Sequence, residues 1–107
     1  MNKDTHTNKI LLLNINSLRV LFLQNNVSKA YTFGSLNTNR FTEKSDIDFL
    51  IEFKTDIEPL QRGENWWALF YGLRDILKRD VDILTSDNIT NLYLKSNIER
   101  TKQLIYG

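Results

Sequence analysis

The segment from Asp46 to Phe53 constrains the fold of this chain of 107 residues more than any other part of the sequence. Apolar and mainly acidic residues alternate along it, and the side chains of a β-strand point alternately to its two faces. The pattern therefore predicts a strand with one apolar face and one acidic face. Because an apolar face must be covered, we expect helices to pack on one side of a small sheet and to leave the other side open. The apolar residues of the segment are Ile47, Phe49, Ile51 and Phe53.

Helical and strand-like patterns alternate along the rest of the chain. Polar stretches at 35–45 and 54–63, the second of which contains the single proline, predict loops between them. The alternation indicates an α/β or α+β fold with one small sheet. Helices are expected from Ile10 to about Asn25, from Glu64 to Lys78 and within Ile89 to Gly107, and strands at Val27 to Phe33, Val81 to Leu84 and Gln103 to Tyr106.

The same patterns predict which side chains are buried. In the first helix, a stripe of apolar residues three to five positions apart is expected to face the core. The second long helix should bury a stripe that includes Trp66, so its neighbour Trp67 is expected at the surface, where a partner could bind. Residues expected to share one face are Ile10, Leu13, Leu18, Leu21 and Phe22 in the first helix, and Val27, Lys29, Tyr31 and Phe33 in the first strand.

Composition and charge exclude several classes of protein. The 14 Lys and Arg residues nearly balance the 13 Asp and Glu residues, so there is no broad positive field to attract nucleic acid or a membrane surface. The absence of cysteine excludes a disulfide scaffold and a thiolate metal site. The apolar run Ile10 to Leu13 is far too short to span a membrane. We therefore expect a cytoplasmic protein with a single domain at 10–107, preceded by a flexible polar leader at 1–9.

Asp46 and Asp48 are the most informative residues for chemistry. Positions i and i+2 of a strand send their side chains to the same face, so the two carboxylates repel each other. Carboxylate oxygens are hard ligands suited to Mg²⁺ or Mn²⁺, and a cation between them would turn the repulsion into coordination. Taken alone, the doublet equally fits two solvated residues at the end of a strand.

Two further features lie near this doublet in the sequence. Gly34-Ser35 ends the first strand, where a glycine lets a phosphate approach the following N–H groups and a serine adds a hydroxyl donor. By itself such a pair is more often a simple turn. Asp80 and Asp82 alternate with apolar residues of a later strand, and Asp82, which lies deeper in that strand, is the candidate for a third carboxylate.

Together these residues resemble a known family. Gly34-Ser35, ten intervening residues and Asp46-Ile47-Asp48 are similar to the GS-x10-DxD motif of the minimal nucleotidyltransferases, in the DNA polymerase β superfamily. The likeness extends over nearly the whole chain, through YTFGS, SDIDFLIEF, VDIL and the closing QLIYG. The resemblance implies an α+β fold with a small mixed, mainly antiparallel sheet flanked by helices.

The resemblance also implies a reaction, a site and a partner. Asp46 and Asp48 would hold two Mg²⁺ ions, with Mn²⁺ as an alternative, and Asp82 would complete the shell of one ion and help to deprotonate the attacking hydroxyl. Gly34 and Ser35 would hold the β and γ phosphates of an NTP, expected to be ATP. A nucleoside monophosphate would pass to a hydroxyl with release of pyrophosphate. Family members of this size are typically antitoxins that adenylylate a tyrosine of a HEPN-domain toxin, which would make such a toxin the partner. Both a hetero-oligomer and a homo-oligomer fit the sequence.

One departure from the family keeps a second hypothesis open. Family members commonly carry an arginine soon after Gly-Ser, whereas Leu36-Asn37-Thr38-Asn39 precedes Arg40 here. The change would lower the affinity for a nucleotide. The alternative is a module with weak or no catalysis that neutralises a partner toxin by binding alone. Transfer to a small molecule is a weaker third hypothesis, because the chain is short for a second substrate pocket.

Overall fold

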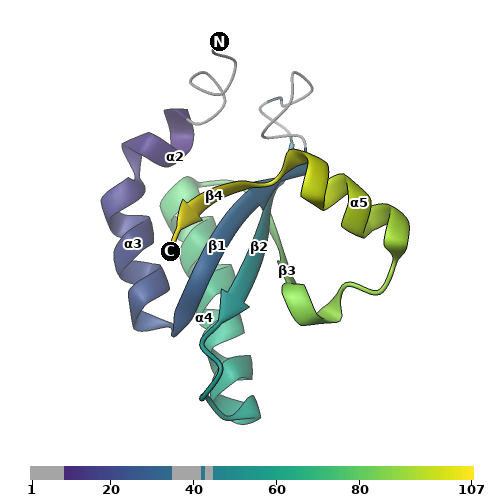
Figure 1. The fold of residues 1–107 in the computed structure, drawn as a ribbon. Coiled ribbons are helices and arrows are strands. Elements are labelled where there is room, and N and C mark those ends of the chain that lie inside the picture. Colours follow the sequence, from purple (N-terminus) through teal and green to yellow (C-terminus); the bar gives the residue numbers. More distant parts are fainter. Residues whose placement is uncertain (1–8, 35–41, 43–44) are drawn as a thin grey trace.

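The computed structural model describes residues 9–34, 42 and 45–107. Four strands form one sheet in the order β3-β2-β1-β4, and helices lie against it (Figure 1). The predicted α+β fold with a mixed, mainly antiparallel sheet is confirmed. β1 (Val27–Phe33) pairs antiparallel with β2 (Ile47–Phe53) and β4 (Gln103–Tyr106), whereas β2 and β3 (Val81–Thr85) are parallel.

Helices cover both faces of the sheet, which corrects the expectation that one face is left open. α3 (Ile15–Gln24) and α4 (Pro59–Leu77) pack on the face that carries the main core, which includes Phe22, Phe49 and Leu69. α5 (Leu92–Thr101) covers part of the other face (Figure 1). There Ile98 is buried against Phe33 and Leu50, so β2 has an apolar residue even on its acidic face. The cover is therefore needed to bury this second core.

The first predicted helix is interrupted at Asn14. Its side-chain Nδ2 donates to the carbonyl of Ile10 (2.9 Å) and its N–H donates to the carbonyl of Leu11 (3.1 Å), which ends α2 (Lys9–Leu13). An asparagine that bonds to the preceding turn in this way competes with the helical pattern. Leu13, expected in the buried stripe, is 76% exposed, and the buried residues of the two helices are Leu11, Leu18 and Phe22.

β1 has the predicted bounds but not the predicted faces. Its pairing with β2 is irregular between Val27 and Lys29, and an extra residue there shifts the alternation of side chains by one. Val27 and Ala30 consequently belong to the main core, whereas Tyr31 and Phe33 pack in the second core. The expectation that Val27, Lys29, Tyr31 and Phe33 share a face was wrong, because a strict alternation cannot reveal such an irregularity.

α4 begins at Pro59, earlier than the predicted start at Glu64. Proline suits the first position of a helix because the N–H that it lacks would have no helical partner there. Trp66 is partly buried against the core, and Trp67 is 55% exposed, as expected for a surface position. α4 is the longest helix of the described residues, and none of the helices there is long and apolar enough to cross a membrane.

Three asparagines tie the turn between α3 and β1 to α4. The buried Asn65 donates from Nδ2 to Oδ1 of Asn25 (3.1 Å) and accepts at Oδ1 from Nδ2 of Asn26 (2.9 Å). Asn25 also donates to the carbonyl of Leu21 (2.9 Å). Each of the two bonds made by Asn65 therefore joins α4 to the start of the sheet.

Replacing Asn65 by alanine is expected to lower the free energy of unfolding by about 2 kcal/mol, because it leaves the buried Asn25 and the partly buried Asn26 each without one hydrogen-bond partner. Urea denaturation of the purified protein measures this loss. Asn16→Ala is the control, because Asn16 is exposed on α3 and its replacement should change the stability by less than about 0.5 kcal/mol. Equal stabilities of the two variants would contradict the role given to Asn65.

Candidate active site

The parallel pairing of β2 with β3 places Asp48 directly opposite Asp82. Residues paired across neighbouring strands lie about 4.8 Å apart and send their side chains to the same face. The adjacent Ile47 and Ile83 are buried in the main core, so the two carboxylates point to the opposite face, which α5 partly covers. Asp48 is half-buried and Asp82 is exposed.

Asp46 immediately precedes β2 and is exposed. Two positions separate it from Asp48, so it belongs to the same face. Burial raises the pKa of Asp48 to about 6, and the negative charges of Asp82 and then Asp46 add to the rise. The three carboxylates that the sequence singles out are therefore close enough to influence one another. Within the described ranges, however, no three acidic or histidine side chains already stand as a compact ligand group.

The burial of Asp48 comes from the second core. Phe33 of β1 is the register partner of Asp48, and Leu50 follows Asp48 on the same face of β2. Both residues are at most 5% exposed. A carboxylate beside such an apolar cluster loses part of its hydration, which favours the protonated form. The second core thus lies beside Asp48, whose burial is the largest cause of the rise in its pKa.

Gly34 lies against the Asp48 carboxylate. Its φ of 74° is in the left-handed region that favours glycine, and a Cβ atom at this position would stand only 2.6 Å from Oδ2 of Asp48. The N–H of Gly34 donates to the hydroxyl of Thr101 at 3.0 Å. Ser35, the other residue predicted to hold a phosphate, lies outside the described residues, as does Arg40.

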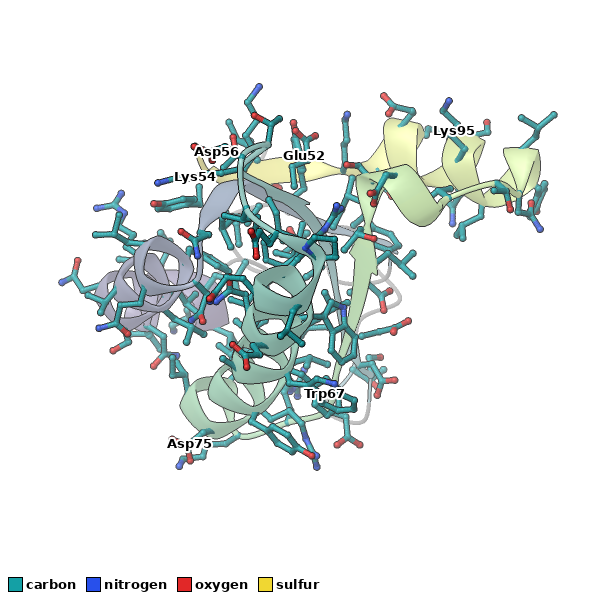
Figure 2. All side chains as sticks on the ribbon, turned by 90° about the horizontal axis from the view of Figure 1, so that it is seen from below. Glu52, Lys54, Asp56, Trp67, Asp75 and Lys95 are labelled. Atoms are coloured by element: carbon teal, nitrogen blue, oxygen red, sulfur yellow. The ribbon has the colours of Figure 1, made fainter. Side chains whose placement is uncertain are left out.

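Two other carboxylates of these strands are placed elsewhere. Asp80 precedes β3, accepts from Nη2 of Arg74 at 3.3 Å and has a side chain that is 73% exposed. Glu52 is the register partner of Lys29 and lies near the end of β2, beside the segment with Lys54 and Asp56 (Figure 2). The separation along β2 keeps Glu52 away from the acidic cluster, and Asp82 is the residue of β3 that joins it.

A cavity of about 360 Å³ lies at the far ends of β2 and β3. It is lined by Phe53 and Thr85, the last residues of these strands, together with Trp66 and Arg62 of α4. Arg62 is paired there with Asp87 at 2.6 Å, and this bond holds the pKa of Asp87 below its usual value. The acidic cluster and this cavity are therefore at opposite ends of the two strands.

Residues 16–107 match the family model described as polymerase beta, nucleotidyltransferase. A candidate protein adenylyltransferase of Methanocaldococcus jannaschii, MJ0126, is 42% identical over 74 residues, which is 69% of this chain and 69% of that protein. The chain therefore belongs to the polymerase beta nucleotidyltransferase family, and it is a nucleotidyltransferase.

Solved structures share the fold at lower identity. A candidate minimal nucleotidyltransferase superposes with a TM-score of 0.64 at 21% identity, covering 88% of this chain and 93% of that one. One chain of a Shewanella oneidensis complex between a tri-AMPylated HEPN toxin and an MNT antitoxin gives 0.61 at 22% identity, covering 90% and 71%. The fold is that of the minimal nucleotidyltransferases, as the resemblance implied.

The raised pKa of Asp48 predicts a pH-dependent stability. Between its ordinary value of 3.8 and about 6, the folded protein binds more protons at Asp48 than the unfolded chain. The free energy of unfolding should therefore fall as the pH rises through this window, by about 1 kcal/mol once the partial exposure of Asp48 is allowed for. Asp48→Asn removes this dependence. The free energy of unfolding of the variant, compared with that of wild type, should therefore rise by about 1 kcal/mol from pH 4 to pH 7.

Urea unfolding of the two proteins at both pH values, with a chelator present, measures the difference. Asp75→Asn is the control, because the side chain of Asp75 is 83% exposed. Its stability difference from wild type should not vary with pH by more than a few tenths of a kcal/mol. A parallel pH response in wild type and Asp48→Asn would contradict the electrostatic description of the site.

Proposed function

We propose that this nucleotidyltransferase is a metal-dependent protein adenylyltransferase that transfers AMP from ATP to a hydroxyl of a partner protein, and that it acts as the antitoxin of a HEPN toxin. The observation that carries the proposal is the pairing of Asp48 with Asp82 beside Asp46 on an exposed part of the sheet. The adenylyl group is supported by the name of the M. jannaschii relative. The partner is supported by the S. oneidensis complex, whose toxin carries AMP groups.

The donor set fits magnesium or manganese. All three residues offer carboxylate oxygens, which these hard cations prefer. Burial raises the pKa of Asp48, and the negative charges of Asp82 and Asp46 add to the rise. A bound cation would remove the cost of this charge repulsion. Asp46, Asp48 and Asp82 would hold the ions, and bound ions would supply charge neutralisation for the phosphoryl oxygens.

The residues of the chain have separate roles in the proposed transfer. A hydroxyl oxygen of the acceptor bonds to the α-phosphorus of ATP while the bond from that phosphorus to the β-bridging oxygen breaks, and pyrophosphate leaves. Asp82 is exposed and can take the proton of the hydroxyl. Asp48 lies on the same face as the buried Phe33 and Leu50 and is proposed to orient the reacting phosphate. Gly34 and Ser35 are proposed to hold the β and γ phosphates.

The proposal predicts that a neighbouring gene encodes a HEPN protein. It is tested by incubating the protein with Mg²⁺, ATP labelled at the α-phosphate and that HEPN protein. We expect label on a hydroxyl-bearing residue of the HEPN protein, one AMP mass for each modified site, and release of pyrophosphate. ATP labelled at the γ-phosphate should transfer no label. Label from the γ position would indicate phosphoryl transfer, and unmodified HEPN protein with both forms of ATP would overturn the proposed function.

A further inference from the structure

Thr101, the last residue of α5, is hydrogen-bonded to the residue that ends β1. Its Oγ1 accepts from the N–H of Gly34 at 3.0 Å, although 67 positions separate the two residues in the sequence. The same hydroxyl donates to the carbonyl of Asn97 at 2.9 Å. A hydroxyl has only one proton to donate. The bond to Asn97 uses this proton and leaves a lone pair directed at Gly34, so the orientation of the hydroxyl is set by its own helix.

The packing of α5 fixes where this hydroxyl stands. Ile98, one turn before Thr101, is 1% exposed and packs in the second core with Phe33 and Leu50. Phe33 immediately precedes Gly34 in the chain. The apolar contact and the hydrogen bond thus join the same end of α5 to two consecutive residues at the end of β1.

The backbone of Gly34 lies close to the Asp48 carboxylate. The 2.6 Å that would separate a Cβ atom of Gly34 from Oδ2 of Asp48 shows how closely the backbone approaches this oxygen. Because glycine has no Cβ atom, its backbone has more conformational freedom than that of other residues, and Gly34 adopts a φ of 74°. A flexible backbone beside a functional carboxylate needs a restraint to keep one conformation. The hydrogen bond from the Gly34 N–H to Thr101 is such a restraint.

We propose that Thr101 is a positioning residue of the nucleotidyltransferase site, whose hydroxyl holds the Gly34 backbone and thereby the place of the Asp48 carboxylate. The expected effect on AMP transfer rests on the proposed function, whereas the effect on the positions of Gly34 and Asp48 does not. Thr101 therefore acts through Gly34 and does not itself touch the reacting atoms.

Thr101→Val tests the proposal, because valine keeps the branched shape of threonine and removes the hydroxyl. Thr101→Ser keeps the hydroxyl, and Ser96→Ala removes an exposed hydroxyl from the same helix as a control. In the valine variant we expect the Gly34 amide to exchange its hydrogen about five- to tenfold faster, the loss typical of one hydrogen bond. We also expect Mn²⁺ to bind about fivefold more weakly, and kcat/KM for ATP to fall about tenfold. The serine and Ser96 variants should stay within about twofold of wild type in all three measurements.

Each outcome decides a separate claim. Wild-type exchange at the Gly34 amide together with wild-type Mn²⁺ affinity in Thr101→Val would overturn the positioning role. Equal losses in Thr101→Val and Thr101→Ser would also overturn it, because they would show that the shape of the side chain matters and its hydroxyl does not. If wild-type protein transfers no AMP, the proposed function fails. The amide exchange and Mn²⁺ measurements then still decide whether Thr101 positions Gly34 and Asp48.

Discussion

Asp48→Asn is expected to reduce AMP transfer by at least about 10²- to 10³-fold and to leave the fold intact. Asparagine has nearly the shape of aspartate but carries no charge, so it cannot hold a divalent cation between β2 and β3 with the same strength. Burial desolvates Asp48, and the negative charges of Asp82 and Asp46 repel it. Removing its charge should therefore not destabilise the protein at neutral pH. Initial rates of label transfer, measured beside urea unfolding, give both quantities.

The matched control is Asp75→Asn, which makes the same chemical change far from the site. Asp75 lies on the outer side of α4, near the margin of the molecule (Figure 2), and contacts Lys78 at 3.7 Å. An exposed pair of this kind contributes little. Its replacement should leave the transfer rate within about twofold of wild type. A similar loss of activity in both variants would show that negative charge in general, and not the acidic cluster, supports the reaction.

The same variant separates the proposed enzyme from a module that only binds. If AMP transfer neutralises the toxin, Asp48→Asn should still form the complex with the HEPN protein and should fail to protect cells that express it. Protection by Asp48→Asn equal to that by wild type would favour neutralisation by binding alone. Complex formation measured by size-exclusion chromatography keeps this comparison independent of the transfer assay.

The order of secondary structure was predictable from the sequence because it depends on local patterns. The alternation at 46–53 and the turn at Gly34 identified β1 and β2 to within a residue of their bounds. The faces of β1 were not predictable, because the irregular pairing near Val27 depends on the strand beside it. The break at Asn14 was missed for a related reason. Whether an asparagine bonds to the preceding turn is decided by geometry and not by residue type.

The site residues could be predicted from the sequence where a charged residue interrupts an otherwise apolar pattern. Asp46, Asp48 and Asp82 conflict with the strand pattern around them, and such conflicts often mark function. No comparable sequence pattern indicates the second core or the role of Thr101. In the sequence, Ile98 is like any apolar residue of a helix, and Thr101 is like any polar residue at the end of one. Both act through contacts between the C-terminal helix and β1, which follow only from the three-dimensional arrangement.

Gly34→Ala is expected to lower kcat/KM for AMP transfer by about 10²-fold, because a small displacement of a catalytic group has an effect of this size. The new Cβ atom would overlap Oδ2 of Asp48, and φ at 74° is unfavourable for alanine. The carboxylate is the mobile end of a short side chain, so we expect it to turn away while the strands keep their positions. The free energy of unfolding should therefore fall by only about 1–2 kcal/mol, the cost of the strained backbone.

Gly63→Ala is the matched control, because it adds the same methyl group to a glycine of α4 whose Cβ atom would meet no atom within 4 Å. Alanine favours a helix over glycine by about 0.8–1 kcal/mol, so this variant should be more stable than wild type and equally active. The two variants thus separate the effect of a methyl group on the backbone from its effect on Asp48. Full activity of Gly34→Ala would show that AMP transfer does not depend on the present position of the Asp48 carboxylate. The catalytic importance of that position would then be refuted.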